Sequence, residues 1–96
     1  MVEVDSALRK MNDYLKELRE ALRALSDEEA RDIVEEIRSH IRDSAEKNGE
    51  LSEEGVSAAL VRLGPPGELG GRYRMESLAQ KAERSRSPWQ IGRAHV

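Results

Sequence analysis

The feature that most constrains the fold is a stripe of apolar residues near the N-terminus. Its members alternate between spacings of four and three, which places them on one face of an α-helix. They are Val4, Leu8, Met11, Leu15, Leu18, Leu22 and Leu25, with Ala7, Tyr14 and Ala21 on one flank. Such a face has to be covered, either by other helices of the same chain or by a second copy in a coiled-coil seam. We favour the bundle, because a convincing seam usually runs longer.

A second helix is predicted from Ser26 onward. Ser26 and Glu29 have the spacing of a capping box, and the acidic residues that follow Ser26 suit the positive end of the helix dipole. The apolar face of this helix consists of Ala30, Ile33, Val34, Ile37, Ile41 and Ala45. We expect the helix to end near Lys47, with Asn48 and Gly49 as the left-handed residues of a helix stop.

Two further helices follow. Ser52 is expected to cap a short third helix, whose apolar residues are Val56, Ala59, Leu60 and Leu63. Gly64 and two prolines end it, and a fourth helix is predicted from Pro66. Its apolar residues are Leu69, Tyr73, Met75, Leu78, Ala79 and Ala82. Three glycines, each costing about 1 kcal/mol relative to Ala inside a helix, weaken its first half.

These patterns predict an all-α fold, a small three-helix bundle with a weaker fourth C-terminal helix. The period-two alternation typical of strands is absent from the sequence. A length of 96 residues fits one small domain, and the absence of Cys excludes disulfides and zinc-thiolate sites. Because the chain has three aromatic residues, its core must be mainly aliphatic.

Residues 44–55 resemble a calcium-binding loop, and the resemblance fails on inspection. Such a loop needs a carboxylate at its first position, Gly at its sixth and Glu at its twelfth. With Gly49 at the sixth position, the first and twelfth positions are Ser44 and Gly55. Starting at Asp43 places Glu54 at the twelfth position but moves Gly49 to the seventh. We therefore interpret the segment as a connector between two helices.

The other residues considered for metal binding or acid–base catalysis also fail to form a recognisable site. His40 follows Glu36 by four residues, a spacing that could supply two metal ligands, yet no third ligand has a recognisable spacing. We expect His40 to be a half-buried, hydrogen-bonded residue at the boundary of the core. Glu35 and Glu36 point about 100° apart on a helix, so they cannot act as an acid and base pair. We assign no catalytic, cofactor-binding or metal-binding residue and expect no enzyme.

The charge distribution argues against binding of nucleic acid. Residues 1–63 hold 10 Lys and Arg against 16 Asp and Glu, whereas residues 64–96 hold 6 against 3. Affinity for phosphates comes from clustered Lys and Arg, which an acidic body with a short basic tail does not provide. We expect no direct nucleic-acid binding.

The order and spacing of the motifs resemble the HAAS family, the helix-turn-helix-associated α-helical signalling domain of bacteria. The resemblance covers roughly residues 10 to 73 and rests on two segments, YLKELREALRALSDEEARDIVEEIRSHI and NGELSEEGVSAALVRLGPPGEL. Its more specific parts are Tyr14-Leu15 with the leucines that follow, the acidic start of the second helix with Arg31 and Ile37, Gly49 before Ser52-Glu53-Glu54, and Leu63-Gly64 with Pro66 and Leu69.

This resemblance implies a cytoplasmic helical module, commonly at the N-terminus of a bacterial membrane protein. It also implies a role in signal transduction beside a PadR-like transcription regulator, without catalytic residues or cofactors. The chain departs from the family pattern at Gly55, Pro65, Gly70 and Gly71. From the last two glycines we expect reduced rigidity in the fourth helix.

The last residues read as an artefact. IGRAHV can be back-translated to ATC GGA AGA GCA CAC GTC, which looks like a sequencing-library adapter, so residues 90–96 are excluded from fold reasoning. Residues 1–73 are then the HAAS-like domain, and residues 74–89 form a basic, juxtamembrane-like helix or linker. Lys81, Arg84 and Arg86 followed by Trp89 are typical of the cytoplasmic side of a membrane entry, and the alternative is a solvated basic tail on a complete soluble protein. We therefore expect a truncated protein that has lost a C-terminal transmembrane region.

Together these features predict a non-enzymatic helical signalling or docking domain on the cytoplasmic face of a bacterial inner membrane, soluble as a fragment. The expected partner is a protein, either a PadR-like regulator or a second copy of the chain. A self-association module using the first helix as a seam is the alternative. A small nucleic-acid-binding regulator and a metal-dependent enzyme are more distant ones. Sequence alone assigns no partner-binding residue.

Overall fold

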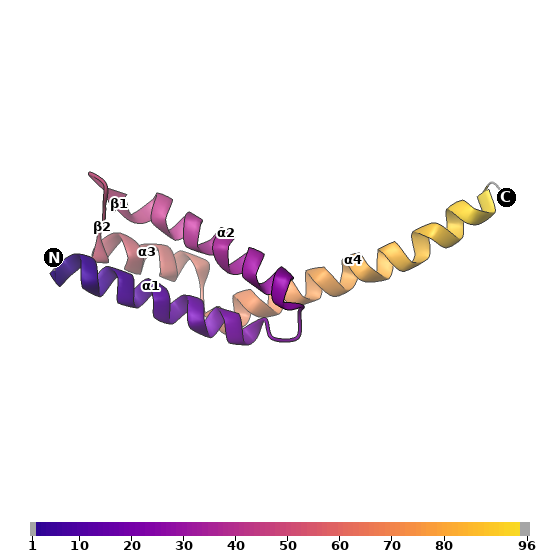
Figure 1. Ribbon diagram of the computed structural model, residues 1–96, viewed down its shortest axis with the longest axis horizontal. Helices are drawn as coiled ribbons and strands as arrows, with labels where there is room; N and C mark the ends of the chain where they lie inside the picture. Colours follow the sequence, from indigo (N-terminus) through magenta and orange to yellow (C-terminus); the bar gives the residue numbers. More distant parts are fainter. Residues whose placement is uncertain (1, 95–96) are drawn as a thin grey trace.

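The computed structural model describes the backbone of residues 2–94 and the side chains of residues 5–82, and this part of the chain contains four α-helices and one short β-hairpin. The helices are α1 (Val2–Ala21), α2 (Asp27–Ala45), α3 (Glu53–Leu63) and α4 (Pro66–Ala94), and the hairpin pairs β1 (Glu46–Lys47) with β2 (Glu50–Leu51). Helices α1, α2 and α3 lie side by side, and α4 starts inside the bundle and projects away from it (Figure 1). The projection gives the molecule principal extents of 64 × 24 × 21 Å. The all-α prediction is confirmed.

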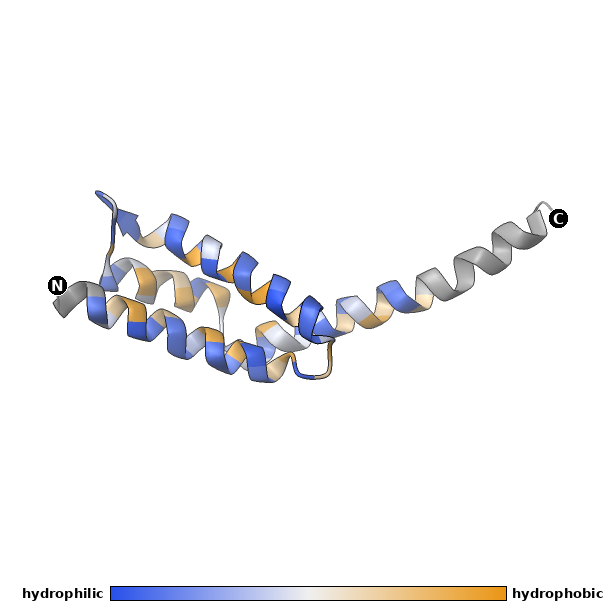
Figure 2. Ribbon diagram, in the orientation of Figure 1, coloured by the Kyte–Doolittle hydropathy of each residue, from blue (hydrophilic) through white to orange (hydrophobic). Residues whose placement is uncertain are grey.

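The apolar stripe of α1 forms the centre of the core. Met11, Leu18 and Leu22 are fully buried, and Leu15 is almost so. Helix α1 contacts α2, α3 and α4, so three elements of the same chain cover its apolar face. Figure 2 shows hydrophobic residues along the sides of the helices that face one another. The bundle interpretation therefore holds, and a seam along this stripe would require surface that the chain already uses internally.

The stripe continues beyond the end of its helix. Helix α1 ends at Ala21, and a tighter turn follows in which the Leu25 amide donates to the Leu22 carbonyl over 2.9 Å. Both leucines remain buried, at 0% and 8% exposure. Apolar spacing thus identified the core residues correctly, although it does not mark where the hydrogen-bonded helix stops.

Serine caps start α2 and α3, as predicted. The Ser26 hydroxyl accepts a hydrogen bond from the Glu29 amide over 3.1 Å, and the Ser52 hydroxyl accepts one from the Gly55 amide over 3.0 Å. Each satisfies one of the free N–H groups at a helix N-terminus. The buried faces of α2 and α3 consist of Ala30, Ile37, Ile41, Ala45, Val56 and Ala59, with Ile33, Val34, Leu60 and Leu63 partly buried against them.

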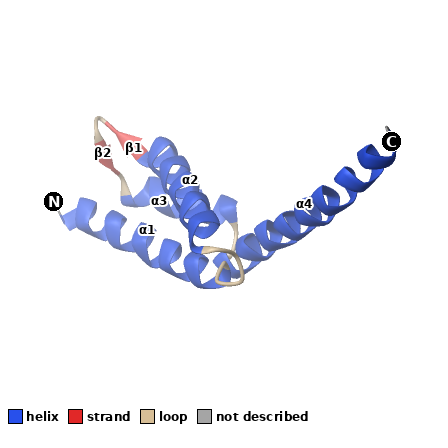
Figure 3. Ribbon diagram, turned by 45° about the vertical axis from the view of Figure 1, so that its right-hand side comes forward, coloured by secondary structure: helices blue, strands red, loops and turns tan. Residues whose placement is uncertain are grey.

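The connector between α2 and α3 corrects one expectation. Helix α2 ends at Ala45, close to the predicted end near Lys47, and the next residues form a two-stranded hairpin at the end of the bundle remote from the projecting part of α4 (Figure 3). Asn48 and Gly49 have φ values of 53° and 81°, the combination that a two-residue hairpin turn requires. They therefore form a β-turn instead of a helix stop. The hairpin brings Leu51 into the core.

Two glycines allow the helices to approach closely. A Cβ added at Gly55 would lie 2.9 Å from the Ala45 Cα atom, and one at Gly70 would lie 2.5 Å from the Ala21 Cβ atom. Real Cβ atoms keep contacts of about 3.5–4.0 Å, so neither site accepts a side chain without movement of a helix. Gly70 thus fixes α4 against α1. The reduced rigidity of α4 that was expected from Gly70 and Gly71 stays a prediction.

Candidate interaction surface

The junction between α3 and α4 is fixed to α1 by one tyrosine. Gly64 ends α3 with a φ of 86°, and the buried Tyr14 hydroxyl donates to the Gly64 carbonyl over 2.7 Å. The Leu69 amide then donates to the Pro65 carbonyl and begins the hydrogen bonding of α4. Burial raises the pKa of Tyr14, and the nearby Arg72 guanidinium partly opposes this rise. Because of these contacts, α4 leaves the bundle from a fixed point.

A second set of contacts joins α4 to the start of α2. The Ser77 hydroxyl donates to the Glu29 carboxylate over 3.1 Å, and the Lys81 ammonium lies 3.8 Å from the same carboxylate. Ser77 is only 8% exposed, a burial that the apolar pattern did not predict. The Glu29 carboxylate thus bonds to α4, while the Glu29 amide bonds to Ser26 as the capping spacing predicted.

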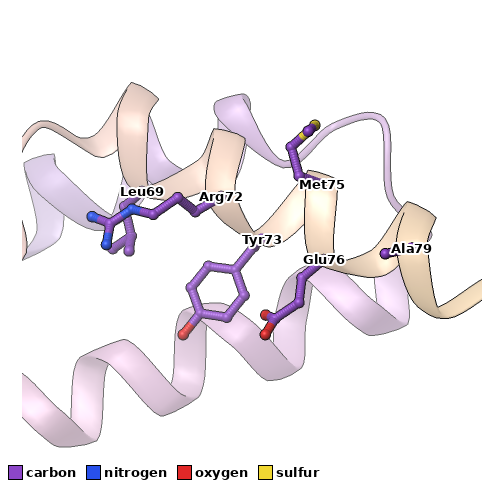
Figure 4. Close-up of a pocket in the computed structure, with 6 residues that line it drawn as sticks. All are labelled: Leu69, Arg72, Tyr73, Met75, Glu76 and Ala79. Atoms are coloured by element: carbon purple, nitrogen blue, oxygen red, sulfur yellow. The ribbon is translucent and has the colours of Figure 1, made fainter.

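Tyr73 lies where α4 passes α2. Figure 4 shows its ring beside Glu76, on the side of α4 that faces a neighbouring helix. Its side chain is partly buried against the core. Burial raises the pKa of Tyr73, the charges of Glu36 and Glu76 raise it further, and Arg72 lowers it. These effects together keep the pKa of the Tyr73 phenol above that of a free tyrosine.

Beside Tyr73, α4 carries an open groove. Its lining residues are Leu69, Arg72, Tyr73, Met75, Glu76 and Ala79, all from α4 (Figure 4). They combine apolar side chains with one cation and one anion. Met75 is 70% exposed, which is unusual for a large apolar residue so close to the core. The groove is thus an uncovered, mainly apolar surface.

The apolar residues of α4 are divided between two sides of the helix. Met75, Leu78, Ala79 and Ala82 are all exposed. Leu78 is 63% exposed. The core-facing side of α4 is instead formed by Leu69, Gly70, Tyr73 and Ser77. Apolar spacing could not separate these two faces, because glycine and serine take core positions in one of them.

A second surface, on α2, is charged instead of apolar. The side of α2 opposite to its buried face carries the exposed carboxylates of Glu28, Asp32, Glu35 and Asp43, together with the exposed Arg31 and Arg42. Arg38 forms an ion pair with Glu35 over 3.4 Å. Acidic residues outnumber basic ones on this helix, so its solvent-facing side is a negatively charged surface.

The residues considered for metal or acid–base chemistry do not assemble into a site. His40 is exposed on α2, so the expectation of a half-buried, hydrogen-bonded histidine is wrong. Asn48 and Gly49 form the hairpin turn, which gives residues 44–55 a shape unlike a calcium loop. Among the side chains that the structure describes, no group of three His, Cys, Asp or Glu residues is placed to hold a metal ion.

Comparison with protein families agrees with this architecture. The HAAS family model matches residues 13–70, which include the second half of α1, all of α2 and α3 and the start of α4. The chain belongs to the HAAS family. The matched region contains most of the buried core, with Ala7 and Met11 preceding it, and ends at Gly70, where α4 touches α1. Searches of curated proteins and of solved structures returned no match.

A membrane entry was expected near the C-terminal end of the chain. Over the part of the chain that the structure describes, no helix combines the length and hydropathy needed to cross a bilayer. Arg84, Arg86 and Trp89, on which the expected membrane entry rests, fall outside the residues whose side chains are described, as do residues 90–96.

Proposed function

We propose that this HAAS domain is a non-enzymatic docking module of a bacterial signalling protein, held at the cytoplasmic face of the inner membrane. Its partner is a PadR-type transcription regulator. The observation that carries the proposal is the family match over residues 13–70, which covers α2, α3 and the second half of α1. The structure adds a rigid body with an acidic side on α2, and an α4 that leaves this body from a fixed point.

Electrostatics favours the acidic side of α2 as the docking surface for such a regulator. A DNA-binding protein needs a basic surface to contact phosphates. The exposed carboxylates of Glu28, Asp32 and Glu35 offer the opposite charge on one side of a helix whose other side is fixed in the core. Complementary charge of this kind raises association rates and selects partners. Binding through this surface would compete with DNA for the regulator.

The direct test is calorimetric titration of the chain into a purified PadR-type transcription regulator. We expect saturable binding that weakens as salt is raised, because exposed charge pairs are screened. The double variant Asp32→Lys with Glu35→Lys should weaken it strongly. Glu50→Lys with Glu54→Lys makes the same change of net charge on exposed residues of β2 and α3, and should leave binding nearly unchanged. Absence of binding by the parent chain would refute the proposal.

A further inference from the structure

The turn of the β1–β2 hairpin holds a chemically reactive pair of residues. Asn48 is followed directly by Gly49, and both are exposed. The backbone nitrogen of a glycine can attack the side-chain Cγ atom of a preceding asparagine, because glycine has no Cβ to obstruct the approach. A Cβ added at Gly49 would meet nothing within 4 Å, so the space around this nitrogen is open.

The side-chain amide of Asn48 is not held by a neighbour. The hydrogen bonds among the side chains that the structure describes include none with Asn48. The other asparagine of the sequence, Asn12, lies within α1, and its side-chain oxygen accepts a hydrogen bond from Arg38 over 3.4 Å. Asn48 is thus the asparagine whose side chain can change its orientation.

We propose that Asn48 is a site of spontaneous deamidation and that opening of the hairpin controls the reaction. The Gly49 nitrogen forms a bond to the Asn48 Cγ atom, the bond from Cγ to Nδ2 breaks, and Nδ2 leaves as ammonia with the Gly49 proton. The resulting cyclic imide then takes up a water molecule. Hydrolysis at the side-chain carbonyl gives aspartate. Hydrolysis at the backbone carbonyl gives isoaspartate, in which the chain continues through the side chain.

The closed turn is itself unreactive, because of the backbone conformation of Asn48. Its φ of 53° lies in the left-handed region, where ψ is also positive, with a usual value of about 47°. At such a ψ the Gly49 nitrogen and the Asn48 Cβ atom lie on opposite sides of the bond from Cα to the carbonyl carbon. The attack needs them on the same side, so Asn48 has to leave the turn conformation first.

Opening the turn disrupts only a small part of the structure. The ladder has two residue pairs, and the pair next to the turn joins Lys47 with Glu50, both exposed. At the base of the hairpin, the Ser52 amide donates to the Ala45 carbonyl over 3.1 Å, and Leu51 is buried in the core. The outer pair can therefore separate while the base stays attached to the bundle. Segments with so little buried surface open far more often than a whole domain unfolds.

The two products should differ in their effect on the hairpin. Aspartate, like asparagine, is a usual residue before glycine in a two-residue hairpin turn. Isoaspartate adds a methylene group to the backbone, and the dihedral angles of such a turn leave no room for an additional backbone atom. Both products add a negative charge, so only the isoaspartate form should weaken the bond from Ser52 to Ala45.

This inference goes beyond the docking proposal and does not depend on it, because the experiment contains no regulator. The whole chain is incubated in mildly alkaline buffer, and peptide mass spectrometry follows the conversion of each asparagine. Conversion of Asn48 in the folded chain should be about tenfold to hundredfold slower than in chain unfolded by urea, since each attack awaits a local opening. Asn12 is the internal control and should stay intact while the chain is folded.

Low urea concentrations, below the unfolding transition, separate opening of the hairpin from unfolding of the domain. Opening of the hairpin exposes little surface, so the conversion rate of Asn48 should change by less than about twofold over this range. Asn48→Asp is the matched control for the products, because it adds the same charge and keeps the backbone. The purified isoaspartate form should lose about tenfold or more of the hydrogen-exchange protection that the Ser52 amide has in Asn48→Asp.

Conversion of Asn48 in the folded chain, at a rate that low urea does not change, establishes the proposal. An Asn48 that stays intact in the folded chain while the unfolded chain converts overturns it. So does a conversion rate that rises in proportion to the unfolded fraction. Equal protection of the Ser52 amide in the isoaspartate form and in Asn48→Asp overturns the predicted effect on the hairpin.

Discussion

The close contact between α4 and α1 at Gly70 leads to a quantitative prediction about stability. Replacing Gly by Ala inside a helix normally stabilises it by about 1 kcal/mol. At Gly70 the new Cβ would lie 2.5 Å from the Cβ of Ala21, and 3.4 Å from its carbonyl carbon. Since contacts between carbon atoms are normally about 3.5–4.0 Å, the helices would have to separate by about 1 Å.

Forcing an extra methyl group into a packed core typically costs about 1–3 kcal/mol and occasionally more. The displacement at Gly70 affects backbone as well as side chain, so we expect the upper part of this range or beyond. After the gain in helix propensity, Gly70→Ala should lower the free energy of unfolding by about 1–3 kcal/mol. For a domain of this size each kcal/mol corresponds to a fall of about 4–8 °C in Tm.

Urea unfolding followed by circular dichroism measures this change. Gly67→Ala is the matched control, because nothing lies within 4 Å of its Cβ position in the same helix. It should be neutral or stabilise by up to about 1 kcal/mol. Adding Ala21→Gly to Gly70→Ala removes the methyl group that clashes, so the double variant should recover at least about 1 kcal/mol of coupling. A Gly70→Ala chain as stable as its Gly67→Ala counterpart would refute the close approach of α4 to α1.

Two further predictions concern the core and the tyrosines. Leu18→Ala should destabilise the bundle by about 2–5 kcal/mol, because Leu18 is fully buried, whereas Val61→Ala, at a side chain that is 80% exposed, should have little effect on urea unfolding. Since the pKa values of Tyr14 and Tyr73 are raised above 10.0, each contributes stability that is complete below pH 10.0 and is lost as the pH rises through the folded-state pKa. Ultraviolet titration should show tyrosinate forming at higher pH in the native chain than in urea; coincident titrations would contradict the burial of both phenols.

Much of the bundle is predictable from local rules. Apolar spacing identified the buried leucines of α1, and the serine caps placed the starts of α2 and α3 correctly. These features depend on residues a few positions apart, whose geometry a helix fixes by itself. The family resemblance is confirmed by the family match over residues 13–70.

The remaining features depend on partners distant in sequence. The Asn48-Gly49 pair is compatible with a helix stop and with a hairpin turn. The hairpin turn forms because it buries Leu51 in the core. Gly70 looked like a weak helix former because its neighbour Ala21 lies far away in the chain. Likewise, Met75 points toward solvent because the opposite side of α4 packs against the bundle, where Ser77 bonds to Glu29.

The central claim is that the apolar stripe of α1 is buried by other helices of its own chain. Amide hydrogen exchange, resolved by residue and recorded at two protein concentrations, tests this most directly. The structure predicts that amides from Met11 to Leu22 exchange slowest, through global unfolding, at rates that do not depend on concentration. Rapid exchange across this segment, or protection that appears only at the higher concentration, would contradict the claim.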